Sequence, residues 1–594
     1  MTAQYAAVHT DNLPGNSPFV IGVSGHRDLH PDELSRLKGV IREFLLQMRQ
    51  QLPDTDFQLL VGMAAGADLL VAQAALEVGM KVQALLPMPL AQYAADFAPD
   101  DYRLLEALLS KPGVTCVELG VPGHLADAHG AVHNVPRDAR YEILADALLR
   151  RTCLLLALWD GRSSHLSGGT GDTVLRYLGV RSGPGHEQIS VSFVEASGEP
   201  LVSQRPVYWV PVARAGGSTR SDLRSPCFLR GVGDNTLEMH RQMPADLVHQ
   251  LAALNAYNRE YVELQRSGRI GAPESLLERL PADVPLDERM MLADIDAQYG
   301  KADTLAMHYQ RRSDGLFLLF GLMTFAMAAA FLIYDKLFES KMLLVLYVLI
   351  LLAGLVVYGV LRRRQWFAKH LTYRALAETM RAKFYLRLAG IDHRVDEAGV
   401  LGLSGIDRFH GFSWIGCVLK AFEVPDVHVA VTQEDHQRRS QCVEKTWIEN
   451  QYRYFARKVS GLERSIRRVK YLQIAMVIVI LVVMAALIFF DTAMEQDRLV
   501  GVSLRNTLTF VMGLLALLLA AWKLHQGKMA TRELLWQYRN QLTHFSEARR
   551  QLARTTSQRR RNDVFFGLGK DSLMESYLWT IHRYHREHEP SVSG

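Results

Sequence analysis

Four long apolar stretches dominate the hydropathy pattern of this chain. Residues 315–334 and 342–361 are two runs without a charged side chain, joined by a short polar segment. Each has about the 20 residues that an α-helix needs to cross the hydrocarbon core of a bilayer. Residues 471–490 and 507–522 repeat this arrangement around a second polar turn. The pattern predicts two transmembrane hairpins. The alternative, buried helices of a soluble protein, is disfavoured by the basic clusters that flank the runs.

Positive charge gathers at one end of each apolar run, away from the two hairpin turns. The cations beside the runs are Arg311, Arg312, Arg362, Arg363, Arg364, Arg464, Arg467, Arg468, Lys470, Lys523 and Lys528. The turns themselves carry few and mixed charges. Because cytoplasmic flanks of transmembrane helices are enriched in Lys and Arg, we expect a four-span protein of the inner (plasma) membrane with both termini in the cytoplasm.

The predicted spans contain no acidic, basic or histidine side chain. A proton relay, a voltage sensor or a coupled transporter therefore has no ionisable group to work with. Helices of this kind serve as anchors or, in an oligomer, surround a hydrophobic constriction that gates by dewetting. Small residues such as Gly321, Gly354 and Gly513 allow close helix contact, so a homo-oligomer is expected, of unspecified number.

Residues 19–215 alternate between strand and helix patterns. The apolar run 19–25 ends in glycine and precedes a helical pattern over 31–51. Further strand patterns fall at 57–62, 81–89, 115–120, 152–161 and 206–214. Strands alternating with helices predict an α/β domain with a parallel sheet, whose ligands bind beyond the carboxyl ends of the strands.

Glycines lie at those expected strand ends. They are Gly22 and Gly25 after the first strand, Gly62 and Gly66 after the second, and Gly168, Gly169 and Gly171 after the strand that ends in WDG. Glycine lets backbone N–H groups approach an anion, and Arg27 is placed to pair with a phosphate. Tight turns alone also favour glycine. No GxGxxG or GxxxxGK[ST] pattern occurs, which disfavours a standard dinucleotide fold or a P-loop ATPase.

An ordered set of motifs carries a family resemblance over residues 19–215. GVSGHRD, VGMAAGADLL, LLPMP, LALWDG and SGGTGDTV together resemble the SLOG superfamily, a Rossmann-like group that includes DprA, the LOG proteins and the nucleotide-sensing region of TRPM channels. The resemblance implies a pocket for a nucleotide or nucleotide derivative, with no further cofactor required. The candidate ligand-binding residues are Gly22, Ser24, Gly25, His26, Arg27, Gly62, Gly66, Asp68, Asp160, Gly168, Gly169, Thr170 and Asp172.

The chain departs from the LOG enzymes at one position. Their PGGxGTxxE pattern carries a glutamate that helps to cleave the ribosyl bond, and alignment of the glycines places Leu175 there. The resemblance thus favours binding over hydrolysis and gives no catalytic residue, although Asp172 can take the role after a shift in register. Asp68 and Asp160 suit ribose hydroxyls or turn caps, and His26 suits either a ligand contact or a hydrogen bond that holds its loop.

A second resemblance covers the membrane regions. YGKADTLAMHYQRR before the first hairpin and YRALAETMRAKFYLRLAGI after it resemble SLATT modules, two-span effectors found with SLOG domains in bacterial conflict loci, which implies a role in bacterial defence. The second half repeats the plan, which predicts a duplicated module. The expected divisions are a tail (1–18), the SLOG-like domain (19–215), a linker with helices (216–298), the first module (299–398), a linker (399–445) and the second module (446–594).

Composition narrows the remaining choices. The net charge of +5 is small and its excess lies beside the spans, which favours anionic lipid over nucleic acid as a partner. The five cysteines lack CxxC spacing, so neither a disulfide framework nor a metal site is expected. The histidine triplet His582, His585 and His588 is typical of a solvated helix face. No signal peptide is apparent.

Three functional hypotheses remain. The first is a pore-forming or channel-like effector whose SLOG-like domain senses a nucleotide-derived ligand and controls an oligomeric membrane region. The second is a membrane-tethered nucleotide hydrolase or glycosidase of the LOG type. The third is an interaction protein that the spans only anchor.

Overall fold

The computed structural model of the chain contains two compact units. Unit 1 comprises Met1–Lys301 with Leu386–His436, and unit 2 comprises Ala302–Tyr385 with Gln437–Gly594. The structure describes residues 16–120, 136–163, 167–180, 192–195, 205–215, 225–232, 236–391, 413–422, 433–490, 494, 498–499, 502–529 and 531–588. Most of the predicted tail and much of the predicted 399–445 linker lie outside these residues.

Unit 1 is built on a nine-stranded, mostly parallel sheet. Its strands are β1 (Phe19–Gly25), β2 (Phe57–Val61), β3 (Lys81–Leu86), β4 (Val114–Glu118), β5 (Leu154–Trp159), β6 (Ser192–Glu195), β7 (Val207–Pro211), β8 (Cys227–Gly231) and β9 (Thr236–His240). Their order is β4-β3-β2-β1-β5-β7-β8-β9-β6. The pairs from β4 through β7 are parallel, and so is β6 with β9, whereas β8 is antiparallel to both of its neighbours.

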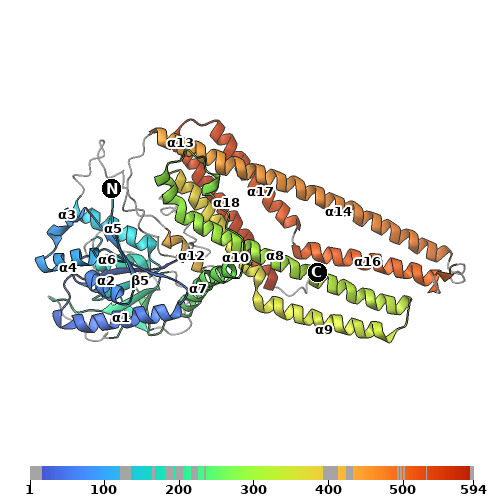
Figure 1. Ribbon diagram of the computed structural model, residues 1–594, viewed down its shortest axis with the longest axis horizontal. Coiled ribbons are helices and arrows are strands. Elements are labelled where there is room, and N and C mark those ends of the chain that lie inside the picture. Colours follow the sequence, from blue (N-terminus) through green and yellow to red (C-terminus); the bar gives the residue numbers. More distant parts are fainter. Residues whose placement is uncertain are drawn as a thin grey trace. The chain divides into compact units, whose positions relative to one another are not determined.

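The core of the sheet follows from its apolar runs. All six side chains of β5 are buried, as expected for a strand with both faces covered. Helices flank the sheet (Figure 1): α1 (Leu34–Gln51), α2 (Ala67–Glu77), α3 (Leu90–Tyr93), α4 (Pro99–Leu109), α5 (Arg137–Arg151) and α6 (Thr170–Leu178). On α1 the buried Phe44 stacks on Tyr208 of β7, with 3.8 Å between ring centroids. This part confirms the predicted parallel sheet.

The sheet extends beyond the predicted six strands. Strand β6 is an addition within the predicted 19–215 domain, and β8 and β9 lie in residues 216–298, which were expected to form a linker with helices. Their five-residue or shorter runs contain charged residues, such as Arg230 and Glu238, that hide strand periodicity. Helix α12 (Ser413–Ala421) likewise falls inside the predicted linker and contacts β1 and α7.

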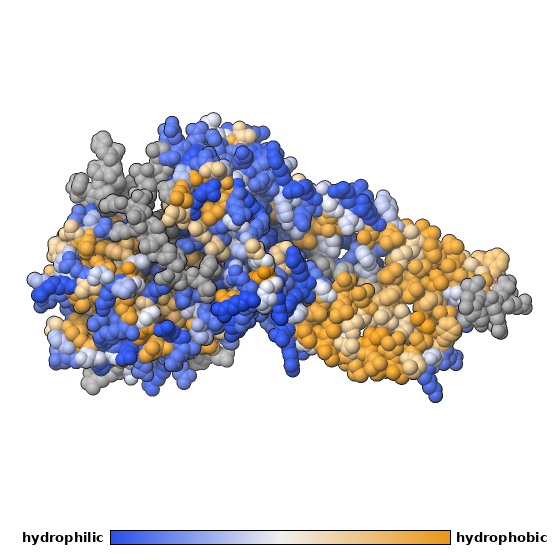
Figure 2. Space-filling model, viewed as in Figure 1, coloured by the Kyte–Doolittle hydropathy of each residue, from blue (hydrophilic) through white to orange (hydrophobic). Residues whose placement is uncertain are grey.

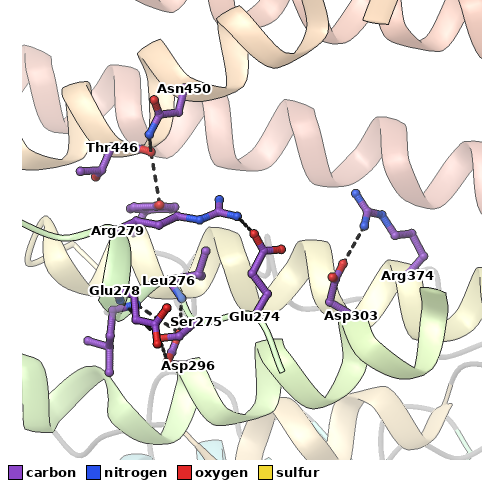
Figure 3. A network of polar contacts seen from close by, with 12 residues as sticks. Glu274, Ser275, Leu276, Glu278, Arg279, Asp296, Asp303, Arg374, Thr446 and Asn450 are labelled. Atoms are coloured by element: carbon purple, nitrogen blue, oxygen red, sulfur yellow. Dashed lines mark hydrogen bonds and ion pairs between the residues drawn. The ribbon is translucent and has the colours of Figure 1, made fainter. Parts of the chain in front are cut away.

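The rest of unit 1 includes α7 (Ala245–Arg266) and the start of α8 (Leu286–Lys336). Polar side chains are buried in this region. The buried Lys301 ammonium donates to Asn258 Oδ1 at 2.7 Å and lies 4.0 Å from the Tyr257 ring centroid. Asp296 accepts the Leu276 N–H at 2.6 Å (Figure 3). Such bonds compensate the cost of burying these polar groups.

Unit 2 carries the predicted spans in long helices. They are the rest of α8, α9 (Lys341–Arg364), α10 (Trp366–Leu388, up to Tyr385), α13 (Gln433–Val443, from Gln437), α14 (Asn450–Phe489), α16 (Leu504–Met529), α17 (Thr531–Ala553) and α18 (Gln558–His588). Two-residue strands, β10 (Arg498–Leu499) and β11 (Val502–Ser503), pair between α14 and α16. A π-helix, Glu444–Glu449, joins α13 to α14.

The structure confirms four helices that are long and apolar enough to cross a membrane. Only 0% to 6% of the residues in each apolar window are buried within the chain. Figure 2 shows these exposed apolar side chains as a continuous region. A surface this apolar is unstable in water, so lipid or further copies of the chain must cover it.

The interior of unit 2 outside the spans is polar in places. Arg374 Nη1 lies 2.7 Å from Asp303 Oδ1 (Figure 3), and Arg374 Nη2 lies 2.5 Å from Glu378 Oε1. Arg381 Nη1 reaches the other oxygen of Glu378 at 2.6 Å. The network therefore holds α8 and α10 together with alternating charges rather than with apolar contact alone.

Candidate functional site

The strand order of the sheet reverses between β1 and β5. From β1 the chain builds outward through β2, β3 and β4, and β5 is then added on the other side of β1. The loops beyond the carboxyl ends of β1 and β5 diverge at such a point, where ligands of open α/β sheets commonly bind. Most of the predicted site residues lie in loops at this edge.

His26 and Asp160 come from the two sides of this reversal. Their atoms Nε2 and Oδ1 are 3.0 Å apart, and both side chains are largely buried. Burial alone would raise the pKa of Asp160, but contact with His26, the Arg162 N–H and Arg214 hold it below its ordinary value. Asp160 is thus a carboxylate at neutral pH, positioned by His26.

Arg27 fixes the first loop against its neighbours. Its guanidinium lies over the Tyr141 ring at 4.9 Å from the centroid. Gly66, with φ of +78°, passes so close that a Cβ there would lie 2.2 Å from the Arg27 carbonyl oxygen. The Ala67 N–H donates to the His26 carbonyl oxygen at 3.1 Å, which joins the start of α2 to the same loop. The β1 and β2 loops therefore form one rigid edge.

Asp68 lies beneath this edge and is 7% exposed. Its Oδ2 accepts the Ala64 N–H at 3.1 Å. Burial raises the pKa of the Asp68 carboxyl to about 7, although Ala64 and Arg27 oppose the shift. A half-protonated carboxyl at neutral pH can both donate and accept a hydrogen bond.

The third glycine loop leads into α6. Gly169 precedes its first residue, Thr170, and the Gly168 N–H donates to Asp172 Oδ2 at 2.9 Å. Gly168 has φ of +74°, and a Cβ there would meet the Tyr141 backbone at 2.8 Å. The Asp172 carboxylate thus stabilises the loop that precedes its own helix. Leu175, which aligns with the LOG glutamate, is 1% exposed. Neither arrangement suggests a hydrolytic carboxylate.

The structure brings most predicted residues together but gives some glycines a packing role. A Cβ on Gly22 would lie 2.0 Å from Thr152 Oγ1, inside the core and before the end of β1. A Cβ on Gly25 would meet Ala67 at 2.3 Å, and one on Gly62 would meet Leu144 at 2.9 Å. Ser24 pairs with Ala157 in the strand ladder. Close packing suffices to explain these three glycines.

Two residues that the sequence reasoning missed complete the edge. Tyr141 contacts both Arg27 and the backbone beside Gly168, so it links the first and third loops. Arg214, after β7, pairs with Asp28 at 3.0 Å and reaches Asp160 at 3.9 Å while its side chain stays 43% exposed. Arg214 ends a predicted strand, so the rule that selected Arg27 also selects it. Tyr141 lies within a helix, and no local signal marks it.

The described residues contain no group of three or more His, Cys, Asp or Glu side chains that could hold a metal ion. Comparisons of the chain with protein-family models, with curated proteins and with solved structures found no match.

Proposed function

We propose that this chain is a ligand-gated membrane effector. A Rossmann-like, SLOG-like region of unit 1 senses a nucleotide-derived ligand and controls an oligomeric, four-span, pore-forming region of the inner membrane. The observation that carries the proposal is the presence on one chain of a polar loop cluster at the strand-order reversal and four apolar helices with exposed faces. The resemblance to SLOG and SLATT modules supports the same pairing.

The polar cluster suits a ligand with both phosphate and sugar hydroxyls. Arg214 is half-exposed and can neutralise a phosphate, and the α2 and α6 N-termini present backbone N–H groups to an anion. The Asp160 carboxylate can accept hydrogen bonds from ribose hydroxyls. Arg27 stabilises the loops from inside and contributes positive potential rather than a direct contact.

The properties of the spans fit an oligomer in which a change of arrangement opens a pore. Gly513 approaches Leu332, where a Cβ would lie 2.9 Å from the leucine side chain, so α16 and α8 meet closely. Most of the remaining apolar surface has no cover from the chain itself. A ligand that favours one arrangement of an oligomer shifts the population of that arrangement, and apolar pores open by wetting.

The test is calorimetric titration of the full chain, in detergent, with adenine and guanine nucleotides, ADP-ribose forms and cyclic signals. Ligand is then recovered and chromatographed. We expect saturable binding, intact ligand, and an affinity about tenfold or more weaker for Arg214→Ala, because a charge-assisted hydrogen bond is lost. The control is Arg241→Ala, whose side chain is 88% exposed and pairs with Glu195 outside the site. Ligand-dependent leakage from liposomes then tests gating.

Other outcomes select the other hypotheses. Ligand that is consumed, with turnover lost in Asp172→Ala, indicates the tethered hydrolase or glycosidase. A folded chain that binds none of the panel and leaks nothing indicates a membrane-anchored interaction protein. Equal weakening by Arg214→Ala and Arg241→Ala contradicts the site, even if binding occurs.

A further inference from the structure

Among the side chains that the structure describes, ten cations border the four spans at the ends away from the hairpin turns, and we name them the membrane-edge cations. They are Arg311, Arg312, Arg362, Arg363, Arg364, Arg464, Arg467, Arg468, Lys470 and Lys523. They precede or follow the apolar windows of α8, α9, α14 and α16 at the ends away from the hairpin turns. Arg312 is partly buried and the other nine are exposed.

Several arginines elsewhere in unit 2 behave differently. Seven of them pair with carboxylates: Arg374, Arg381, Arg453, Arg539, Arg549, Arg550 and Arg561. Within the part of the chain that the structure describes, none of the membrane-edge cations lies in such a pair. The fold thus pairs many arginines away from the spans with carboxylates and leaves a run of cations without such partners where the apolar surface begins.

Aromatic side chains accompany this charge. The Arg312 guanidinium lies 5.1 Å from the Trp366 ring centroid. Tyr471, 66% exposed, follows Lys470, and Trp522, 42% exposed, precedes Lys523. Tyrosine and tryptophan favour the headgroup level of a bilayer, where their rings are half in the apolar layer. The cations beside them therefore lie at the depth of lipid phosphates.

The opposite end of the first hairpin is balanced. Lys336 lies 3.0 Å from Asp335, and Glu339 and Lys341 complete a set with no net charge. The charge asymmetry is thus a property of the two ends of the same helices. It cannot be attributed to a general need for solubility beside an apolar surface.

We propose that the membrane-edge cations bind the headgroups of anionic phospholipids, and that this binding stabilises the folded membrane region. The proposal rests on the membrane embedding within the proposed function, but not on ligand sensing. Each juxtamembrane cation strengthens contact with an anionic surface by about fivefold. Salt weakens the contact because the cations are exposed.

The experiment follows thermal unfolding of the full chain in a neutral detergent during titration with dioctanoyl phosphatidylglycerol. Parallel titrations use dioctanoyl phosphatidylcholine and inorganic phosphate. We expect phosphatidylglycerol alone to raise the unfolding midpoint, with the effect reduced in high salt. In the triple variant Arg362→Gln/Arg363→Gln/Arg364→Gln, the half-saturating lipid concentration should rise about a hundredfold. Each lost cation weakens lipid binding about fivefold, and the three factors multiply.

Two matched variants make the result specific. Lys336→Gln/Lys341→Gln removes two charges from the opposite helix ends and should respond like the parent chain. Arg362→Lys/Arg363→Lys/Arg364→Lys keeps the charge and should keep most of the response. The proposal is overturned if phosphatidylcholine or free phosphate stabilises the chain equally, or if the two glutamine variants lose the response alike. Flotation with neutral liposomes separately tests membrane embedding, so its failure is distinguishable.

Discussion

The two units of this protein differ in what covers their most apolar elements. In unit 1, every residue of β5 is apolar and buried. In unit 2, α9 has no buried residue at all, although it is the most apolar of its neighbours, while Asp303 and Arg381 are less than 10% exposed. The difference shows that the spans of unit 2 need a solvent other than water.

A large effect is expected from the ion network of unit 2. Glu378 contacts Arg374 and Arg381 through its two oxygens, and these contacts hold the pKa of its carboxyl below the ordinary value against the effect of burial. Glu378→Ala removes both pairs and should lower the free energy of unfolding by about 3 kcal/mol. Chemical denaturation in detergent measures this loss, and hydrogen exchange assigns it to α8 and α10.

The control is the exposed pair of Arg550 and Glu547, whose side chains are 64% and 50% exposed. Glu547→Ala should change stability by no more than about 0.5 kcal/mol, since solvent screens such pairs. If both substitutions cost the same, solvent screens the Glu378 network as it screens the exposed pair.

A smaller loss is expected from a glycine in the sheet of unit 1. A Cβ on Gly22 would lie 2.0 Å from Thr152 Oγ1, so Gly22→Ala should destabilise unit 1 by about 2 kcal/mol through overpacking. Gly39→Ala is the control, because it lies in α1 with open space around its Cβ and should stabilise by up to about 1 kcal/mol. Exchange rates in β1 and β5 report the result. Unchanged rates there would leave a ligand role as the explanation for this glycine.

Sequence patterns predicted the elements that are marked by apolar runs in their own sequence. The spans and the strands β1, β2, β3 and β5 consist mainly of apolar residues, and the structure contains each of them. Strands β8 and β9 were missed because their pairing partners, not their own periodicity, determine them. The helix α12 was missed for a related reason, since its burial depends on contacts far away in the chain.

Of the candidate site, the sequence allowed us to predict only the residues in the loops after the strands. Glycine and arginine beside strand ends follow from local geometry, which explains why Gly66, Arg27 and Gly168 could be selected. Tyr141 joins those loops from a helix more than 70 residues after Gly66, and such a contact has no local signature. The buried state of Asp68 also depends on the whole fold.

Asp68 gives unit 1 a pH dependence. Its pKa is raised to about 7 in the folded chain from 3.8, so the folded state binds its proton more tightly than the unfolded state does. Stability should therefore fall as the pH rises from about 4 to about 7, by at most about 1.4 kcal/mol per pH unit. Asp68→Asn should flatten this part of the profile. The exposed Asp283→Asn should leave it unchanged, and an unaltered profile in Asp68→Asn would place the titration elsewhere.

The smallest predicted effect concerns one hydroxyl pair inside unit 2. Thr379 is fully buried and donates to the Ala375 carbonyl at 2.8 Å, so the Tyr577 hydroxyl, 2.7 Å away, donates to Thr379. Tyr577→Phe should cost about 1 kcal/mol, the net value of one buried hydrogen bond, because Thr379 keeps its other partner. A double-mutant cycle with Thr379→Val isolates the coupling between α10 and α18. A coupling near zero would mean that this hydroxyl pair does not hold α10 and α18 together, and that apolar packing between the two helices does.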